Sequence, residues 1–236
     1  MRRTSEDVTS TPAPDADFIA EFGPGWSANG VIAVLEPLVS DARRARIGQV
    51  LEQRLESVTV LMDAPHDPHN GAAVLRSCDA FGVQELHIVP REEPFLLSSR
   101  VSKGTERWVD VVEHANPEAA VSALRSRGFT LVATHPQAEL TPADLAGIPR
   151  LALVLGNEHD GIREALAAAA DRSVGIPMRG FVESLNVSVS AAVLLEAATR
   201  ARTGDLDSNR KRALYARGLY RSVVRGRDVL DALEAR

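Results

Sequence analysis

Residues 151–170, LALVLGNEHDGIREALAAAA, hold the pattern that decides the fold. The apolar run at 151–155 is short and bounded by a turn signal, which predicts a fully buried strand. A loop bracketed by Gly156 and Gly161 follows, and residues 162–170 predict a helix. A buried strand that passes directly into a helix is typical of an α/β domain.

The same strand–helix unit recurs on both sides of this stretch. Strands are predicted at residues 58–62, 86–89, 109–112, 130–134, 151–155 and 173–176, and helices at 71–81, 117–127, 162–170 and 187–203. Strands that alternate with helices at this spacing predict an α/β fold with a mainly parallel sheet and helices on both faces.

The two ends of the chain differ from this central pattern. Residues 1–35 are rich in Ser, Thr, Pro, Ala, Asp and Gly, which predicts a flexible N-terminal tail. The main domain is predicted at 36–205 and begins with a helix at 37–55. Residues 206–236 are predicted to form a basic C-terminal helical extension.

The composition excludes several classes of protein. The chain has 236 residues, of which 44% are apolar and 25% charged, as expected for a globular chain. Its apolar runs are shorter than the roughly 20 residues needed to cross a bilayer, and the N-terminus lacks a secretory pattern. We therefore expect no membrane partner. The single cysteine, Cys78, is consistent with a cytoplasmic protein and predicts a packed core thiol.

The net charge of −5 hides an uneven distribution. Residues 210–227 contain seven basic residues and no acidic one, and a shorter cluster comprises Arg43, Arg44 and Arg46. Such blocks attract phosphate even on an acidic protein. In the predicted C-terminal helix, Arg217, Arg221 and Arg225 lie opposite an apolar stripe of Tyr215, Leu219 and Val223. The alternative is that these arginines only solvate helix surfaces.

Common catalytic motifs are absent from the sequence. No G-x-G-x-x-G follows a predicted strand, and neither a P-loop nor a G-x-S-x-G elbow occurs. The six histidines do not cluster with other ligands, so no metal site is expected.

Three polar segments follow predicted strands. The first runs from Asn70 to Arg76, the second is Leu155-Gly-Asn-Glu-His-Asp-Gly161, and the third is Ile176-Pro-Met178 with Ser184-Leu-Asn186. In the first segment, the apolar neighbours Val74, Leu75 and Cys78 predict that Arg76 is half-buried. Each segment alone fits an ordinary strand-to-helix turn. Because the carboxyl ends of parallel strands share one sheet edge, the three together predict a site.

In their order and their residues, these segments resemble the motifs of the SPOUT class of methyltransferases, and within it those of the SpoU/TrmH family of RNA ribose 2′-O-methyltransferases. The first segment matches N-x-x-A-x-x-R, the second L-G-x-E-x-x-G, and the third I-P-M followed by S-L-N-V-S-V. The resemblance covers about residues 36–203. Residues 43–54 and 58–62 are similar to family members that methylate guanosine 18 in the tRNA D-loop.

The resemblance implies a C-terminal trefoil knot, S-adenosyl-L-methionine as cofactor, and a homodimer. The resemblance also implies catalytic roles for Arg76, Asn70, Glu158, Ser184 and Asn186, whereas the expected absence of a metal rests on the scattered histidines alone. It places Thr134, Gly156, Ile176, Leu185 and Asn186 at the cofactor, with Gly156 pressed against adenosine. The family arginine at position 76 is often assigned as a general base, whereas its high pKa favours a phosphate clamp.

The function expected from the resemblance is methyl transfer from S-adenosyl-L-methionine to a ribose 2′-hydroxyl, at guanosine 18 of tRNA. The basic clusters Arg43, Arg44, Arg46, Arg217, Arg221 and Arg225 would then contact the RNA backbone. The alternatives are the same reaction on 23S rRNA or another tRNA position, and a non-catalytic RNA-binding scaffold of the SPOUT class.

Overall fold

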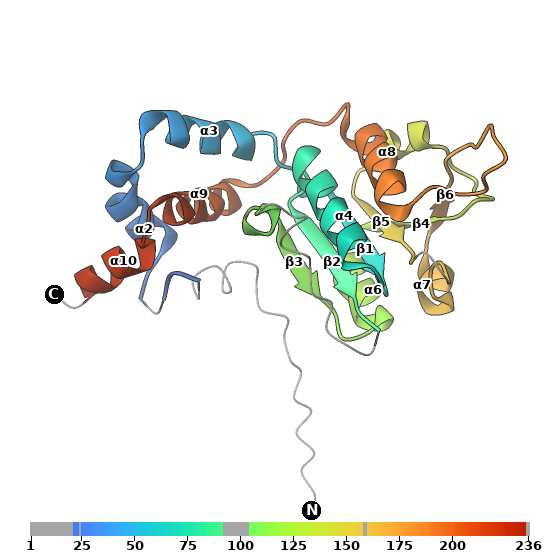
Figure 1. Cartoon of the computed structure of the whole chain (residues 1–236), viewed down its shortest axis with the longest axis horizontal. Helices are drawn as coiled ribbons and strands as arrows, with labels where there is room; N and C mark the ends of the chain where they lie inside the picture. The colour runs from blue at the N-terminus through green and yellow to red at the C-terminus, as the bar shows by residue number, and fades with distance from the viewer. Residues whose placement is uncertain (1–20, 24, 92–103, 158–159, 235–236) are drawn as a thin grey trace, which may run out of the picture. The chain divides into compact units, whose positions relative to one another are not determined.

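The structure is a computed structural model that describes residues 21–23, 25–91, 104–157 and 160–234 (Figure 1). The chain divides into two compact units. One unit is Glu52–Asp205, and the other joins the residues up to Leu51 with those from Leu206 onward. Among the described residues, no helix is both long and apolar enough to span a membrane.

The unit at Glu52–Asp205 is built on a six-stranded sheet with the order β3-β2-β1-β5-β4-β6. All five neighbouring pairs are parallel. The strands are β1 (Val58–Asp63), β2 (Glu85–Val89), β3 (Asp110–Glu113), β4 (Thr130–Thr134), β5 (Leu151–Leu155) and β6 (Arg172–Val174). The six strands expected from apolar runs are confirmed, and so is the α/β class.

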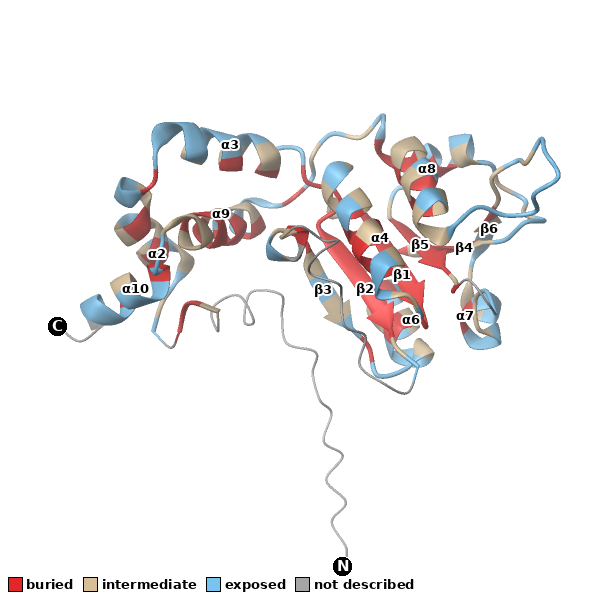
Figure 2. Cartoon of the chain, viewed as in Figure 1, coloured by how far each residue is buried: buried red, intermediate tan, exposed pale blue. Residues whose placement is uncertain are grey.

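Helices cover both faces of this sheet. Helices α4 (Pro68–Ala80) and α8 (Val187–Thr199) pack on one face, where Leu75 and Leu194 join Val60 and Leu153 in one core. Helices α6 (Pro117–Ser126) and α7 (Glu164–Ala169) pack on the other, with Leu124 and Leu166 against Leu131 and Val154. The central strands are therefore buried on both sides (Figure 2).

Short helical turns and caps complete the unit. The 3₁₀ turns are η2 (Thr105–Arg107) and η3 (Pro142–Gly147). Helix α6 begins as its sequence predicts, since the Asn116 side chain accepts a hydrogen bond from the Ala119 N–H at 2.8 Å. Helix α4 begins earlier than predicted, because Asp67 caps it by accepting from the His69 N–H at 2.8 Å.

The second unit is entirely helical in its described part. It comprises α2 (Ala28–Leu35), the 3₁₀ turn η1 (Glu36–Leu38), α3 (Asp41–Leu51), α9 (Ser208–Ser222) and α10 (Gly226–Glu234). Val31 and Leu35 of α2 are fully buried in a core that includes Leu214 and Leu219 of α9. Segments from opposite ends of the chain therefore fold together.

Three boundaries at the chain ends differ from the sequence predictions. Helix α2 lies within the predicted tail, because Ser27 caps it and its apolar residues bury against α9. The helix predicted at 37–55 is split into η1 and α3, and at Leu55 the backbone instead bonds Gly82 and Gln84. The C-terminal helix is interrupted between α9 and α10, where Arg225 adopts a left-handed φ of 57°.

A buried polar cluster lies at the β2–β3 side of the sheet. Glu85 and His87 of β2 are buried beside His114, and Nδ1 of His87 and Nε2 of His114 share a hydrogen bond of 2.8 Å. Arg127 donates to the Glu85 carboxylate at 2.6 Å. Burial, followed by the charge of His87, lowers the pKa of His114 to about 4. Burial opposes ionisation of Glu85, but bonds from His87 and Arg127 outweigh it and lower its pKa to about 2.

This cluster predicts that the unit loses stability on acidification below about pH 6.5. The unfolded chain takes up a proton at residue 114 near the ordinary histidine value of 6.5, whereas the folded protein resists it until about pH 4. The free energy of unfolding, measured by urea denaturation, is therefore expected to fall between pH 6.5 and 4. His114→Gln should flatten this dependence, and the exposed His135→Gln control should not. An unchanged slope in His114→Gln would contradict the assignment.

Candidate active site

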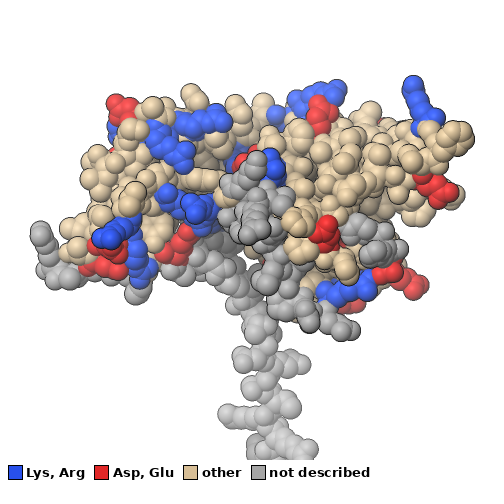
Figure 3. Space-filling model, in the orientation of Figure 1, with Lys and Arg blue, Asp and Glu red and all other residues tan. Residues whose placement is uncertain are grey.

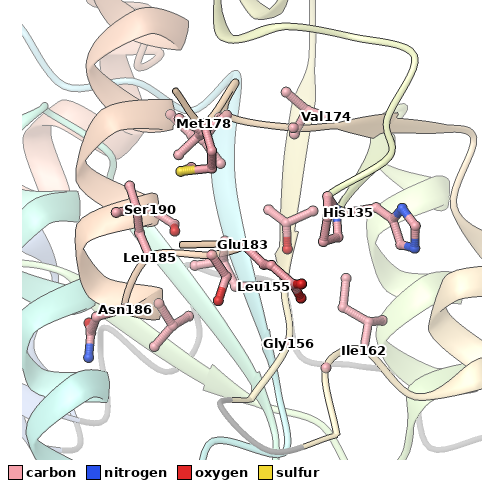
Figure 4. A pocket seen from close by; sticks show the side chains of 18 of the residues that line it. His135, Leu155, Gly156, Ile162, Val174, Met178, Glu183, Leu185, Asn186 and Ser190 are labelled. Atoms are coloured by element: carbon pink, nitrogen blue, oxygen red, sulfur yellow. The ribbon is translucent and has the colours of Figure 1, made fainter. Parts of the chain in front are cut away.

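A cavity of about 560 Å³ opens at the carboxyl ends of β4, β5 and β6 (Figure 4). Its walls come from the residues that follow these strands and from the segment that leads into α8. This is the edge where ligands bind in open parallel sheets, because the loops that follow the strands converge there. The volume suits a small molecule of nucleoside size.

All five residues expected at the cofactor line this cavity. They are Thr134 at the end of β4, Gly156 after β5, Ile176 after β6, and Leu185 and Asn186 before α8. Ser184, expected to be catalytic, lines it as well. One concave surface is thus formed by residues from three strand ends and one helix start, which lie up to 52 positions apart in the sequence.

Asn186 joins this cavity to the first polar segment. Its Nδ2 donates a hydrogen bond of 3.1 Å to Oδ1 of Asn70 at the start of α4. Its own Oδ1 accepts from the Ser188 N–H at 2.8 Å and caps α8. Both Nδ2 and Oδ1 of the Asn186 side-chain amide are therefore used, which fixes the orientation of the side chain.

The structure gives a reason for glycine at position 156 that is separate from the expected contact with adenosine. Asn157 donates a backbone hydrogen bond of 3.1 Å to the Gly161 carbonyl, so the loop closes on itself. A Cβ at position 156 would lie 2.3 Å from the Gly161 carbonyl carbon and 2.5 Å from the Ile162 nitrogen. Glycine is required here by the return of the loop.

The sequence interpretation missed the ion pair between Asp63 and Arg163, which anchors the loop after β5. The carboxylate of Asp63, at the end of β1, is fully buried, and it accepts hydrogen bonds of 2.6 Å from both the backbone N–H and the Nε of Arg163. Arg163 directly follows Gly161 and Ile162, which line the cavity. An aspartate directly after the apolar run at 58–62 was the available signal.

Of the expected catalytic residues, Asn70 and Arg76 are described but do not line the cavity. Arg76 lies on α4 with an exposed side chain, so the predicted half-buried setting is wrong. Arg76 lies six positions after Asn70, which turns the two side chains to different faces of the helix. Glu158 lies outside the described residues.

The expected basic stripe on the C-terminal helix is also revised. Arg217 is buried at 8% exposure, and its Nε lies 3.3 Å from the carboxylate of Glu21. Arg221 donates two hydrogen bonds to the same carboxylate, at 2.9 and 2.5 Å. These two arginines therefore hold the helical unit together and do not form a solvated RNA-facing surface.

The remaining candidate arginines lie toward solvent in the helical unit. Arg43 is exposed and donates to the Ser222 hydroxyl at 3.1 Å, Arg44 is half-buried and pairs with Asp41, and Arg46 is exposed. The Arg225 side chain is 81% exposed. Basic side chains gather over the part of this unit that holds α3 (Figure 3).

The chemistry of the cavity fits a nucleoside without phosphates. Its described lining has apolar walls such as Leu155 and Ile176, hydrogen-bonding groups such as Ser184 and Asn186, and no lysine or arginine. A phosphate site would call for such cations or a glycine-rich helix start. Within the described residues, no group of three His, Cys, Asp or Glu side chains could hold a metal ion.

A parallel sheet with a nucleoside-sized cavity at its carboxyl edge defines a small-molecule-binding α/β domain. Residues 57–196 match the SpoU rRNA Methylase family, and with the relatives below this match shows that the chain belongs to that family. The expected family resemblance is confirmed.

Two relatives in sequence illustrate this membership. The chain is 40% identical over 164 residues to the tRNA (guanosine(18)-2'-O)-methyltransferase of Thermus thermophilus, covering 69% of this chain and 84% of the relative. It is 35% identical over 165 residues to the enzyme of the same name from Escherichia coli, covering 70% and 72%.

Solved structures agree with the sequence relatives. The A. aeolicus TrmH/SpoU tRNA modifying enzyme superposes with a TM-score of 0.70 at 29% identity, covering 78% of this chain and 98% of that one. The SpoU methyltransferase AviRb from Streptomyces viridochromogenes, in complex with AdoMet, superposes with a TM-score of 0.56 at 29% identity, covering 63% and 60%.

Proposed function

We propose that this protein transfers a methyl group from S-adenosyl-L-methionine to the ribose 2′-hydroxyl of guanosine 18 in tRNA. The observation that carries the proposal is the convergence of Thr134, Gly156, Ile176, Leu185 and Asn186 on one cavity at the sheet edge. The names of the Thermus thermophilus and Escherichia coli relatives support the nucleotide and the RNA. The AdoMet complex of AviRb supports the cofactor.

The cavity residues would bind and orient the cofactor. S-adenosyl-L-methionine supplies an electrophilic methyl group when bound. Ile176 and Leu185 offer apolar walls on which an adenine ring can pack, while the backbone after β5 and β6 supplies hydrogen-bonding groups. The return of Gly161 against Gly156 would help to shape this surface for the collinear arrangement that displacement needs.

Asn70, Asn186 and Ser184 would position the ribose. The hydrogen bond between Asn70 and Asn186 connects the cavity to the surface of α4, where Arg76 is exposed. We assign Arg76 to the phosphate of the target nucleotide, because its guanidinium stays charged and presents a planar fork to phosphate oxygens. Glu158 would order the loop after β5. The ribose proton then leaves to water as the oxygen is methylated.

The two units would have different roles in the reaction. The unit at Glu52–Asp205 carries the methyl-transfer site, and the helical unit supplies RNA-backbone contacts through Arg43, Arg44, Arg46 and Arg225. The RNA substrate and the buried thiol of Cys78 support a cytoplasmic location.

We further propose that the chain is knotted and dimeric. Strand β6 pairs with β4 on one edge, and on its other edge Ser173 and Gly175 exchange backbone hydrogen bonds of 3.0 Å with Leu140. Enclosure of β6 between these segments supports the trefoil knot. Val189 and Val193 lie four residues apart on α8 and remain exposed, which supports a homodimer through this helix.

The proposed function is tested by methylation of an unmodified tRNA transcript and, in parallel, of 23S rRNA fragments with labelled S-adenosyl-L-methionine, followed by mapping of the modified nucleotide. Label on the 2′-oxygen of guanosine 18 is the expected result, with a transcript carrying 2′-deoxyguanosine at position 18 as the control. Label at another tRNA position or only on 23S rRNA fragments would contradict the substrate. Absence of transfer to any RNA would contradict the activity.

A further inference from the structure

Glu183 differs in charge from the other side chains around the cavity. Within the described lining it is the sole carboxylate, and no lysine or arginine accompanies it. Figure 4 shows its side chain extending from the segment before α8 into the space between that segment and Ile162. Among the described lining residues the other ionisable side chain is His135, whose ring is turned away from the cavity in the same view.

The Glu183 carboxylate is placed where a ligand could use its charge. None of the described residues forms an ion pair or a hydrogen bond with it. Leu155, Ile162 and Ile176 line the same cavity, and apolar walls reduce the screening of a charge by water. His135 does not compete for it, since its ring is turned away from the cavity (Figure 4), where its Nδ1 accepts a hydrogen bond from the Gln137 N–H at 3.1 Å.

We propose that Glu183 is a specificity-determining residue that favours the positively charged methyl donor over the spent product. This inference rests on the proposed function. During transfer the C–S bond of the donor breaks and a C–O bond to the ribose forms, while the hydroxyl proton passes to water. The sulfur keeps the electron pair of the broken bond and loses its positive charge. A carboxylate that faced the sulfur would therefore attract the donor and would lose that attraction once the methyl group had left.

The consequence is a built-in discrimination between two molecules that differ by one methyl group and one charge. S-adenosylhomocysteine retains every other group of the donor, so apolar walls and backbone contacts hold both equally. Since Glu183 is exposed, water screens its charge, and we expect it to account for only about a three- to fivefold preference.

The experiment is calorimetric titration of the full-length protein without RNA, using S-adenosylmethionine and S-adenosylhomocysteine as separate ligands. Glu183→Gln should weaken binding of the donor about three- to fivefold and leave binding of the product unchanged. Glu183→Asp, which keeps the charge, should retain most of the preference. An analogue with a protonated amine in place of the methylated sulfur should follow the donor, which separates charge from contact with the methyl group.

Glu118→Gln provides the matched control, because it removes one exposed carboxylate on α6 of the same unit, away from the cavity. It should leave both affinities unchanged. An equal donor-to-product ratio in wild type and Glu183→Gln would overturn the role of Glu183 while leaving the proposed function intact. A wild-type protein that binds neither ligand would contradict the proposed function itself. Thermal unfolding of Glu183→Gln should match wild type, as expected for an exposed side chain.

Discussion

Replacement of Arg76 by lysine is expected to lower the turnover of RNA methylation at least a hundredfold, about 2.7 kcal/mol in activation free energy. The reason is geometric, since lysine keeps the charge but lacks the planar fork that a phosphate clamp requires. Because Arg76 does not line the cavity, binding of S-adenosyl-L-methionine should be unchanged. The measurement is single-turnover methylation of a tRNA transcript together with calorimetric cofactor binding.

Arg200→Lys is the control for this experiment. Arg200 is an exposed arginine of the same unit, and it pairs with Glu196 on α8 at 2.7 Å. Turnover should stay within about twofold of wild type, because a surface ion pair of this kind contributes little. Near-normal turnover in Arg76→Lys would exclude Arg76 both as a clamp and as a base.

Replacement of Asp63 by alanine is expected to reduce the free energy of unfolding of the Glu52–Asp205 unit by about 3 kcal/mol. The fully buried carboxylate accepts two hydrogen bonds from Arg163, and its removal leaves the guanidinium partly buried without its partner. The loop that carries Gly161 and Ile162 loses its anchor to β1, so cofactor affinity should fall as well. Urea denaturation and calorimetric binding measure the two effects.

An ion pair at the surface provides the control for the buried pair of Asp63 and Arg163. Glu139 and Arg172 form an ion pair in which both side chains are about half exposed, and Glu139→Ala should cost less than about 1 kcal/mol. Addition of Arg163→Met to Asp63→Ala should restore part of the stability, because no buried charge then remains uncompensated. Equal losses in Asp63→Ala and Glu139→Ala would contradict the anchoring role.

Much of the sheet and of the cavity could be predicted from local patterns. The run at 151–155 is apolar throughout because β5 lies in the middle of the sheet, with helices over both faces. Polar residues after such runs meet at one edge, so Thr134, Gly156 and Ile176 could be expected to converge. The expected contact of Gly156 with adenosine stays a prediction, and the structure adds a second reason for glycine, since nothing local shows that Gly161 returns to within contact of it.

The arginines of the C-terminal helix show where local patterns fail. Periodicity placed Arg217 and Arg221 on one stripe of a helix, which was correct, but could not show what faces that stripe. Their partner Glu21 is about two hundred positions away in the sequence, and its carboxylate turns a candidate RNA surface into an internal ion-pair network. Helix α2 was missed for the same reason, because its burial depends on α9.

By itself the sequence determined the strands, their parallel arrangement and the polar segments that follow them, because these depend on periodicity and turn chemistry within a few residues. Which charges are used internally depends on contacts between distant segments, and these appear only in the folded chain. Folding paired Asp63 with Arg163 and Glu21 with Arg217, and it left the Glu183 carboxylate facing the cavity. The free energy of a charge depends on its burial and partners, which residues far apart in the chain create only when they fold together.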